Sequence, residues 1–208
     1  MVGSSLSAVM LRRVQFALIG LFAAALAGMI AVPLIAPRLG VTAGDHLGRG
    51  DYTLQTTDGQ RFTAATLRGK PSAVFFGYTH CPDVCPTTLG DIAVWQQDLG
   101  PQAADLRIFF VTVDPDRDTG PMLRDYLSWT EGVTGVTGPR AQIDRAIAAF
   151  NIFARKVDGP EGDYTMDHTA SIRLFDGQGR FVGNIGYQEP PDTVLPKLKS
   201  LIATGSGA

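Results

Sequence analysis

The sequence predicts an α/β fold, and three neighbouring segments carry this prediction. Ser72–Phe76 is a short apolar run rich in β-formers, which is typical of a buried strand. Residues 86–99 follow a helical pattern, and residues 106–113 form a second apolar run of the same kind. A strand, a helix and a second strand in this order imply a right-handed crossover and a parallel pair of strands.

A β-hairpin is expected before this unit. Residues 51–56 form its first strand, Asp58-Gly59 supplies the turn, and residues 61–63 form its second strand. The hairpin would extend the α/β unit at its N-terminal end.

A polar loop, Asp114–Thr119, follows the second apolar run. Its acidic residues resemble a calcium loop, but an EF-hand loop has Gly at its sixth position, which Thr119 occupies here. We therefore interpret it as a loop in which Asp118 or Thr119 caps a helix running to about Trp129.

The remaining elements complete the domain. In order they are a Gly/Thr-rich connector at 132–139, a helix at 140–150, a strand at 152–157, a mobile turn-forming stretch at 158–163 leading through 164–168 into a strand at 169–175, a hairpin turn at 176–179, a strand at 180–185 and a helix at 190–202. This order predicts a thioredoxin-like fold with an N-terminal β-hairpin extension. We assign residues 51–203 to this domain and residues 204–208 to a disordered tail.

The N-terminal region predicts one transmembrane helix. Residues 14–36 are 23 positions without a charged side chain, and about 20 suffice to cross the bilayer core. Arg12 and Arg13 precede this run, so the positive-inside rule places residues 1–13 in the cytoplasm and the domain in the periplasm. The expected location is thus the cytoplasmic membrane. A cleaved signal peptide is the alternative, because Ala25-Leu26-Ala27 resembles a cleavage site.

Charge excludes one class of partner. The chain has 18 basic and 20 acidic residues and a net charge of −2. Because no basic stripe is present, we expect no nucleic-acid binding.

Cys81 and Cys85 are the only cysteines, and they lie where a predicted strand leads into a predicted helix. Positions i and i+4 share a face of a helical turn, so both sulfur atoms can reach one point. The positive end of the helix favours thiolate over thiol. Two adjacent thiolates can close a disulfide or hold a soft ion such as Cu(I). A structural disulfide, or two buried free thiols, is the alternative.

Three histidines could add a ligand. His46 lies in residues 37–50, a glycine-rich segment expected to be a solvated tether. His80 adjoins Cys81, but the turn that follows is expected to point its ring away from the thiols. His168 sits at the mouth of a strand, after the mobile stretch. A histidine in such a position is a hydrogen-bonded structural residue or a metal ligand.

The stretch Gly77–Leu89 resembles the copper motif of the Sco/SenC family. Members of this family are membrane-anchored copper chaperones with a thioredoxin fold, needed for cytochrome c oxidase assembly. The resemblance covers about residues 50–203 and the N-terminal anchor, and it extends through Val113–Thr119, Gly132–Gly135 and Tyr164–Thr169.

The resemblance implies a ligand set. Cys81, Cys85 and His168 would bind copper, as Cu(I) through the thiolates and as Cu(II) with the added imidazole. Asp167 is a candidate for a hydrogen bond to the His168 ring, or alternatively for a backbone cap at the loop end. Ile152-Phe153 departs from the tyrosine-bearing strand expected there, which concerns packing rather than ligation.

Two functions are compatible with these residues. The first is a metallochaperone that delivers copper to the CuA centre on the copper-bearing subunit of cytochrome c oxidase and breaks no substrate bond. The second is a thiol–disulfide oxidoreductase that reduces the copper-site cysteines of the oxidase or defends against oxidants, and it needs only Cys81 and Cys85. The sequence does not identify the upstream copper donor.

Overall fold

The computed structural model describes residues 13–14, 16–23, 25 and 46–205. The described residues belong to two compact units, divided between Ala43 and Gly44.

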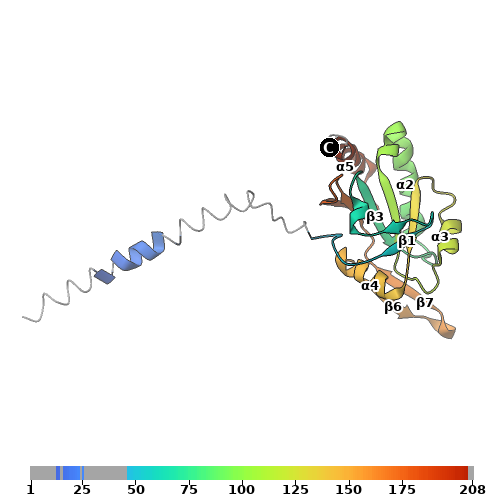
Figure 1. Cartoon of the computed structure of the whole chain (residues 1–208), viewed down its shortest axis with the longest axis horizontal. Coiled ribbons are helices and arrows are strands. Elements are labelled where there is room, and N and C mark those ends of the chain that lie inside the picture. The colour runs from blue at the N-terminus through green and yellow to red at the C-terminus, as the bar shows by residue number, and fades with distance from the viewer. Residues whose placement is uncertain (1–12, 15, 24, 26–45, 206–208) are drawn as a thin grey trace, which may run out of the picture. The chain divides into compact units, whose positions relative to one another are not determined.

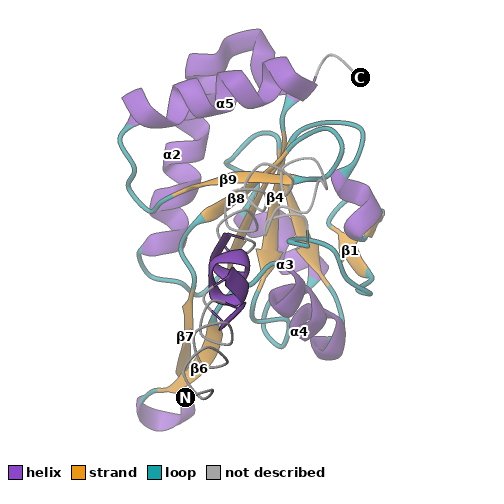
Figure 2. Ribbon diagram, turned by 90° about the vertical axis from the view of Figure 1, so that its left-hand side faces the viewer, coloured by secondary structure: helices purple, strands orange, loops and turns teal. Residues whose placement is uncertain are grey.

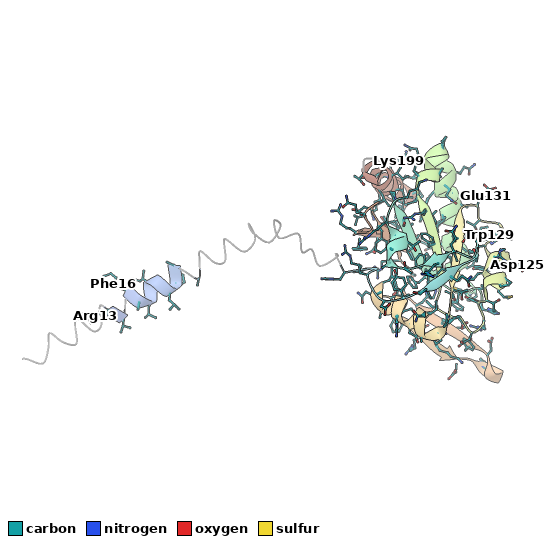
Figure 3. All side chains as sticks on the ribbon, in the orientation of Figure 1. Arg13, Phe16, Asp125, Trp129, Glu131 and Lys199 are labelled. Carbon is teal, nitrogen blue, oxygen red and sulfur yellow. The ribbon has the colours of Figure 1, made fainter. Side chains whose placement is uncertain are left out.

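The described part of the first unit is helical at residues 13–14, 16–23 and 25. Its large apolar side chains are exposed, and Figure 3 labels Phe16 beside Arg13. Within the described residues, no helix has the length and apolarity needed to cross a membrane. The rest of the predicted anchor, including most of residues 24–36, lies outside the described residues.

The second unit is built on a seven-stranded sheet with the order β2-β1-β5-β4-β3-β8-β9. β3 lies parallel to β4, and β4 lies parallel to β5, which confirms the predicted parallel pair. The strands of this sheet are β1 Leu54–Thr56, β2 Arg61–Phe62, β3 Ser72–Gly77, β4 Arg107–Thr112, β5 Val133–Thr137, β8 Ile172–Phe175 and β9 Phe181–Ile185.

Helices cover both faces of the sheet, with α2 and α5 on one side and α3 and α4 on the other (Figure 2). The α-helices are α2 Val84–Leu99, α3 Gly120–Tyr126, α4 Arg140–Ala149 and α5 Pro191–Gly205, and the 3-10 helices are η2 Ala64–Leu67, η3 Gly100–Asp105 and η4 Pro160–Gly162. Alternate β3 side chains serve the two faces. Ala73 packs in the apolar layer with Ile92 of α2, whereas the Phe76 ring contacts Phe150 at the end of α4. The fold is thus the expected α/β, thioredoxin-like arrangement.

The N-terminal β-hairpin is present where the sequence predicts it. Leu54 pairs with Phe62 and Gln55 with Arg61 across β1 and β2. β1 also pairs with β5, so the hairpin extends the main sheet.

The predicted connector at 132–139 is wrong, because it contains β5. This strand lies between β1 and β4 in the interior of the sheet. Three glycines concealed the strand, and one of them has a packing reason. A Cβ on Gly135 would lie 2.7 Å from Cγ2 of Thr57 and 3.0 Å from Cδ1 of Leu127. Only a residue without a side chain fits so close to its neighbours.

The strand expected at 169–175 is shorter than predicted, and residues 164–168, expected to lead into it, form a strand of their own. β7 Tyr164–His168 pairs with β6 Ala154–Asp158 in a separate two-stranded sheet, and β8 begins at Ile172. Figure 1 shows β6 and β7 projecting from the body of the domain. His168 is therefore the last residue of β7 rather than a residue at the mouth of the following strand.

Both ends of the domain are longer than expected. Residues 46–50, predicted as tether, form a turn in which Gly48 N donates to Ala149 O and Tyr52 OH donates to Gly48 O. At the other end, α5 continues to Gly205, so Thr204 and Gly205 are helical rather than disordered. Residues 206–208 lie outside the described residues.

Candidate metal centre

The two thiols lie in the connection between β3 and α2. Cys81 N donates to Tyr78 O within the turn, and α2 begins at Val84, two residues earlier than the sequence pattern suggests. Cys85 is thus in the first helical turn, and its N–H donates to Cys81 Sγ at 3.4 Å. Both cysteines are free; Cys81 is half-buried and Cys85 is buried.

Gly77 at the end of β3 permits this arrangement. A Cβ at that position would lie 2.8 Å from Cys85 Sγ and 2.8 Å from the Phe110 ring. Real Cβ atoms essentially never lie under 3.0 Å from a non-bonded heavy atom. The absence of a side chain at Gly77 therefore makes room for the buried sulfur.

His168 reaches the thiols from β7. Its Nε2 atom lies 3.5 Å from Cys85 Sγ, and its Nδ1 atom lies 3.1 Å from Thr169 O. Because a carbonyl oxygen only accepts, Nδ1 donates, and the neutral ring then has its lone pair on Nε2, toward the sulfur. The Cys81, Cys85 and His168 ligand atoms all lie within 4.8 Å of one another.

Two aromatic rings hold the imidazole in place. The ring centroids of Tyr78 and His168 are 5.8 Å apart at an interplanar angle of 89°. The Phe75 ring lies 6.3 Å away at 64°. These edge-to-face contacts restrict the ring on the side that faces β3.

The thiols have opposite electrostatic surroundings. A hydrogen bond from Cys85 lowers the pKa of Cys81 to about 4, although partial burial of Cys81 opposes this shift. The same bond, together with burial, raises the pKa of Cys85 well above its ordinary value. The expected low pKa is therefore found at Cys81, but its main cause is the bond from Cys85, and backbone N–H groups at the start of the helix add only a smaller part. For Cys85 in the protein without metal the expectation is wrong. The Cys85 thiol therefore donates a hydrogen bond to the Cys81 thiolate, and the two groups titrate as a coupled pair.

The other candidate residues lie away from the sulfur atoms. His46 is exposed in the turn at 46–50, and His80 is exposed with its Nδ1 atom 2.9 Å from Thr79 Oγ1. Asp167 pairs with Arg155, its neighbour across the β6–β7 ladder, at 2.8 Å. The Nδ1 atom of the His168 ring pairs with the backbone carbonyl of Thr169 and not with Asp167.

The loop Asp114–Thr119 contributes more than a helix cap. Thr119 does cap α3, since its Oγ1 accepts from Met122 N. Asp118 is fully buried and instead accepts from Thr79 N at 3.1 Å and from Thr79 Oγ1 at 2.6 Å. Sequence reasoning missed this contact, although a signal existed. The loop follows β4, and the cysteine turn follows β3. The carboxyl ends of adjacent parallel strands meet at one edge of a sheet.

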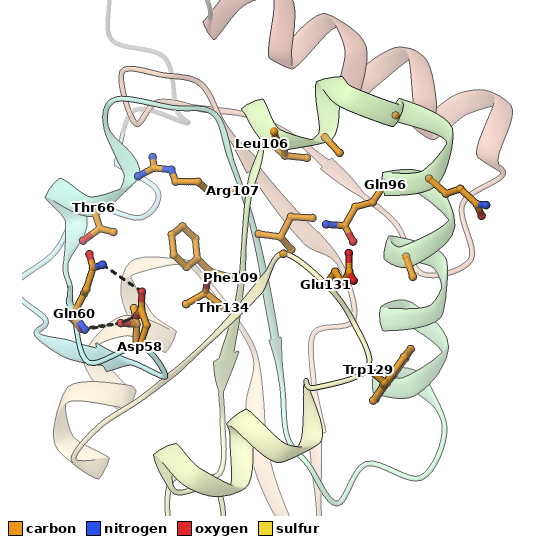
Figure 4. Close-up of a pocket in the computed structure, with 18 of the residues that line it drawn as sticks. Asp58, Gln60, Thr66, Gln96, Leu106, Arg107, Phe109, Trp129, Glu131 and Thr134 are labelled. Atoms are coloured by element: carbon orange, nitrogen blue, oxygen red, sulfur yellow. Dashed lines mark hydrogen bonds between the residues drawn. The ribbon is translucent and has the colours of Figure 1, made fainter.

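A cavity of about 960 Å³ lies elsewhere, between α2 and the β1–β2 hairpin (Figure 4). Its carboxylates, Asp58 and Glu131, lie on opposite sides, and Gln60 donates to Asp58. Neither a thiol nor an imidazole lines it. The cavity therefore offers no alternative to the three convergent ligand atoms.

The sequence profile of the SCO1/SenC family matches residues 41–203. The chain belongs to this family. The SCO/SenC relatives include an SCO2-like protein of Rickettsia felis, 32% identical over 153 residues that cover 72% of this chain and 75% of that protein. The mitochondrial SCO1 protein of Saccharomyces cerevisiae is 31% identical over 161 residues, 74% of this chain and 55% of that protein.

Two solved structures of Sco proteins are similar throughout the domain. Copper-bound ScoI of Bradyrhizobium japonicum has a TM-score of 0.69 and 40% identity, covering 74% of this chain and 99% of that chain. Copper-bound Sco1 of yeast has a TM-score of 0.68 and 30% identity, covering 76% and 89%. Both confirm the fold of this SCO1/SenC domain.

Proposed function

We propose that this SCO1/SenC protein binds one copper ion through Cys81, Cys85 and His168. The observation that carries the proposal is the convergence of two sulfur atoms and one nitrogen atom within 4.8 Å. Metal–thiolate bonds of about 2.3 Å and metal–imidazole bonds of about 2.0 Å place two ligands of one ion no more than about 4.6 Å apart. Small side-chain movements therefore suffice to close the site.

The donor types suit a soft metal ion such as copper or zinc, and the copper-bound relatives favour copper. Thiolates stabilise Cu(I), and an imidazole allows the same site to accept Cu(II). Copper-bound ScoI and Sco1 are similar proteins, which supports this assignment. The low pKa of Cys81 supplies one deprotonated ligand in advance, and binding displaces the proton of Cys85.

The proposed role of the bound copper is delivery to the CuA centre of cytochrome c oxidase during assembly. The part-exposed residues Cys81 and His168 support it, because a partner's ligand can approach the site from their side while the buried Cys85 still holds the ion. Copper would then pass by exchange of ligands, without cleavage of a bond in the partner. The oxidase role rests on family membership.

Thiol–disulfide exchange is the second candidate, favoured by the ionised Cys81 beside the Cys85 thiol. In that reaction the Cys81 thiolate attacks a target disulfide and forms a mixed disulfide. Cys85 then attacks the mixed disulfide and releases the target. The target has gained two electrons and leaves with both of its cysteines as thiols. The protein is left with a Cys81–Cys85 disulfide, and His168 takes no part.

His168 therefore separates the two functions. In copper-limited cells, His168→Ala should impair oxidase assembly as Cys81→Ser does, while the variant's two thiols still oxidise and reduce. Normal assembly with His168→Ala, together with failure of Cys81→Ser, would exclude copper delivery and favour the dithiol reaction.

We also propose that residues 14–36 anchor the chain in the cytoplasmic membrane, with the domain of residues 51–203 in the periplasm. The uncharged run and the preceding Arg12 and Arg13 support this topology.

A further inference from the structure

We propose that the loop Asp114–Thr119 positions the two ligand-bearing segments through separate contacts. Asp118 holds the cysteine turn, whereas Asp114 and Arg117 hold β7 and thereby His168. The inference rests on the copper site proposed above and assigns a role to residues outside the ligand set.

Asp118 is the contact to the cysteine turn. Its carboxylate is fully buried and accepts from Thr79 N, Thr79 Oγ1 and Thr112 Oγ1, the two hydroxyls at 2.6 Å each. A buried carboxylate requires such donors, and bonds to a charged acceptor are short and strong. Thr79 lies two residues before Cys81, and Thr112 ends β4. Asp118 thus fastens the start of the cysteine turn to the neighbouring strand.

Arg117 is the contact to β7. Its Nε atom donates to Asp114 Oδ2 at 2.5 Å, and its Nη1 atom donates to Tyr164 O at 3.0 Å. Its guanidinium also lies 3.6 Å from the centroid of the Tyr164 ring. Tyr164 OH in turn donates to Asp114 Oδ1 at 2.9 Å. These three residues form a closed set of charge-assisted contacts.

The position of Tyr164 transmits this contact to the imidazole. Tyr164 begins β7 and His168 ends it, and residues four apart lie on the same face of a strand. Fixing one end of a five-residue strand that is paired along its whole length with β6 fixes the other end. The Asp114–Arg117–Tyr164 set therefore orients the ligand that comes from β7.

Two hydrogen bonds connect the Asp118 contacts with the Asp114–Arg117–Tyr164 set. Asp118 N donates to Asp114 O at 2.9 Å, and Asp114 N donates to Thr112 Oγ1 at 2.8 Å. The side chains nevertheless diverge to different ligand-bearing segments. The Asp118 contacts should control the thiols, and the Tyr164 contacts should control the imidazole.

Two variants and a control separate these effects in the full chain. Asp118→Asn disturbs the cysteine turn, and Tyr164→Phe removes the hydroxyl that binds Asp114. Asp116→Asn is the control, because Asp116 belongs to the same loop but faces Arg140 at 3.5 Å with 71% of its side chain exposed. Thr79→Val removes one donor to Asp118 and serves if Asp118→Asn does not fold.

Two measurements are needed. The first is the alkylation rate of Cys85 in the metal-free protein at one fixed pH, which reports opening of a buried thiol. Thr79→Val is the decisive variant here, because it removes a donor to Asp118 and leaves the charge near the thiol unchanged. We expect about a tenfold rise for Asp118→Asn and a smaller rise for Thr79→Val. Tyr164→Phe and Asp116→Asn should stay within about twofold of the unaltered protein.

The second measurement is Cu(II) affinity with the absorption spectrum of the complex. We expect Tyr164→Phe to bind about tenfold more weakly with a shifted spectrum, since lost partners of a ligand typically cost 10–100-fold. Asp116→Asn should match the unaltered protein in both.

The results that would refute the positioning proposal differ from those that would refute the copper site. If Asp118→Asn or Thr79→Val lowers only the melting temperature, or if Tyr164→Phe opens Cys85 as much as Asp118→Asn does, the separate positioning is refuted. If the unaltered protein binds no copper, the proposed function fails, and alkylation still decides the role of Asp118. If copper binds normally to Tyr164→Phe, only the role of Tyr164 fails.

Discussion

The Nε2 atom of His168 lies 3.5 Å from the Sγ atom of Cys85, a residue 83 positions earlier in the chain. The sheet produces this contact. The two thiols follow the carboxyl end of β3. β8 pairs antiparallel with β3, so β8 begins at that same edge of the sheet, just after His168. Nδ1 of the ring is occupied by Thr169 O, so the lone pair on Nε2 is available where a thiolate-bound ion would sit.

The two thiols should titrate differently. The bond from Cys85 lowers the pKa of Cys81 to about 4, so Cys81 is a thiolate from neutral pH down to that value. Alkylation of Cys81, followed by mass spectrometry against pH, should show a midpoint near 4, while Cys85 stays unreactive at neutral pH. Cys85→Ala should raise the midpoint. A midpoint at or above the ordinary value of about 8.5 would contradict the assignment.

Gly77→Ala should damage the site. The added methyl group collides with Cys85 Sγ and the Phe110 ring, which we expect to cost about 1–3 kcal/mol of unfolding free energy and to weaken copper binding. Gly90→Ala is the control, because Gly90 lies in α2 with open space at its Cβ position and should gain up to about 1 kcal/mol. Denaturant unfolding measures both. Equal stability of the two variants would refute the close approach.

Asp167→Asn should leave the copper affinity unchanged. The carboxylate pairs with Arg155 on the exposed face of β7, with 51% of its side chain exposed, and such pairs contribute roughly 0–1 kcal/mol. Isothermal titration with copper provides the measurement. A loss of tenfold or more would show that Asp167, rather than Thr169 O alone, supports the imidazole.

The proposed anchor can be tested by fusing, after Ala208, a reporter that is active only outside the cytoplasm. We expect activity in the membrane fraction, because an uncharged run follows Arg12 and Arg13. A soluble periplasmic product that begins near Gly28 would establish cleavage instead.

Local pattern was sufficient for the segments whose hydrophobicity matches their structure. Ser72–Phe76 and residues 106–113 are predominantly apolar runs, and the structure places β3 and β4 there. β5 was not predictable in this way, because Gly135 interrupts its β-branched residues and Gly132 and Gly138 flank them. Gly135 is required by Thr57 and Leu127, which are distant in the sequence, and such packing is not visible in local composition.

The ligands of the candidate site carried recognisable chemistry, whereas the residues that hold them did not. Two cysteines four positions apart predict a shared point of contact. By contrast, Asp118 and Arg117 resemble an ordinary polar loop until β3 and β4 are placed side by side. Their partners, Thr79 and Tyr164, are 39 and 47 positions away, so only the three-dimensional arrangement reveals the contacts.

Copper binding by the full chain, purified in detergent under reducing conditions and then offered one equivalent of copper, tests the central claim most directly. We predict one copper per chain after desalting, with a sulfur-to-copper charge-transfer band when Cu(II) is bound. Cys81→Ser and Cys85→Ser should lose copper, and His168→Ala should bind Cu(II) at least tenfold more weakly while keeping its fold. Unchanged Cu(II) affinity in His168→Ala, or no copper retained by the unaltered protein, would contradict the three-ligand site.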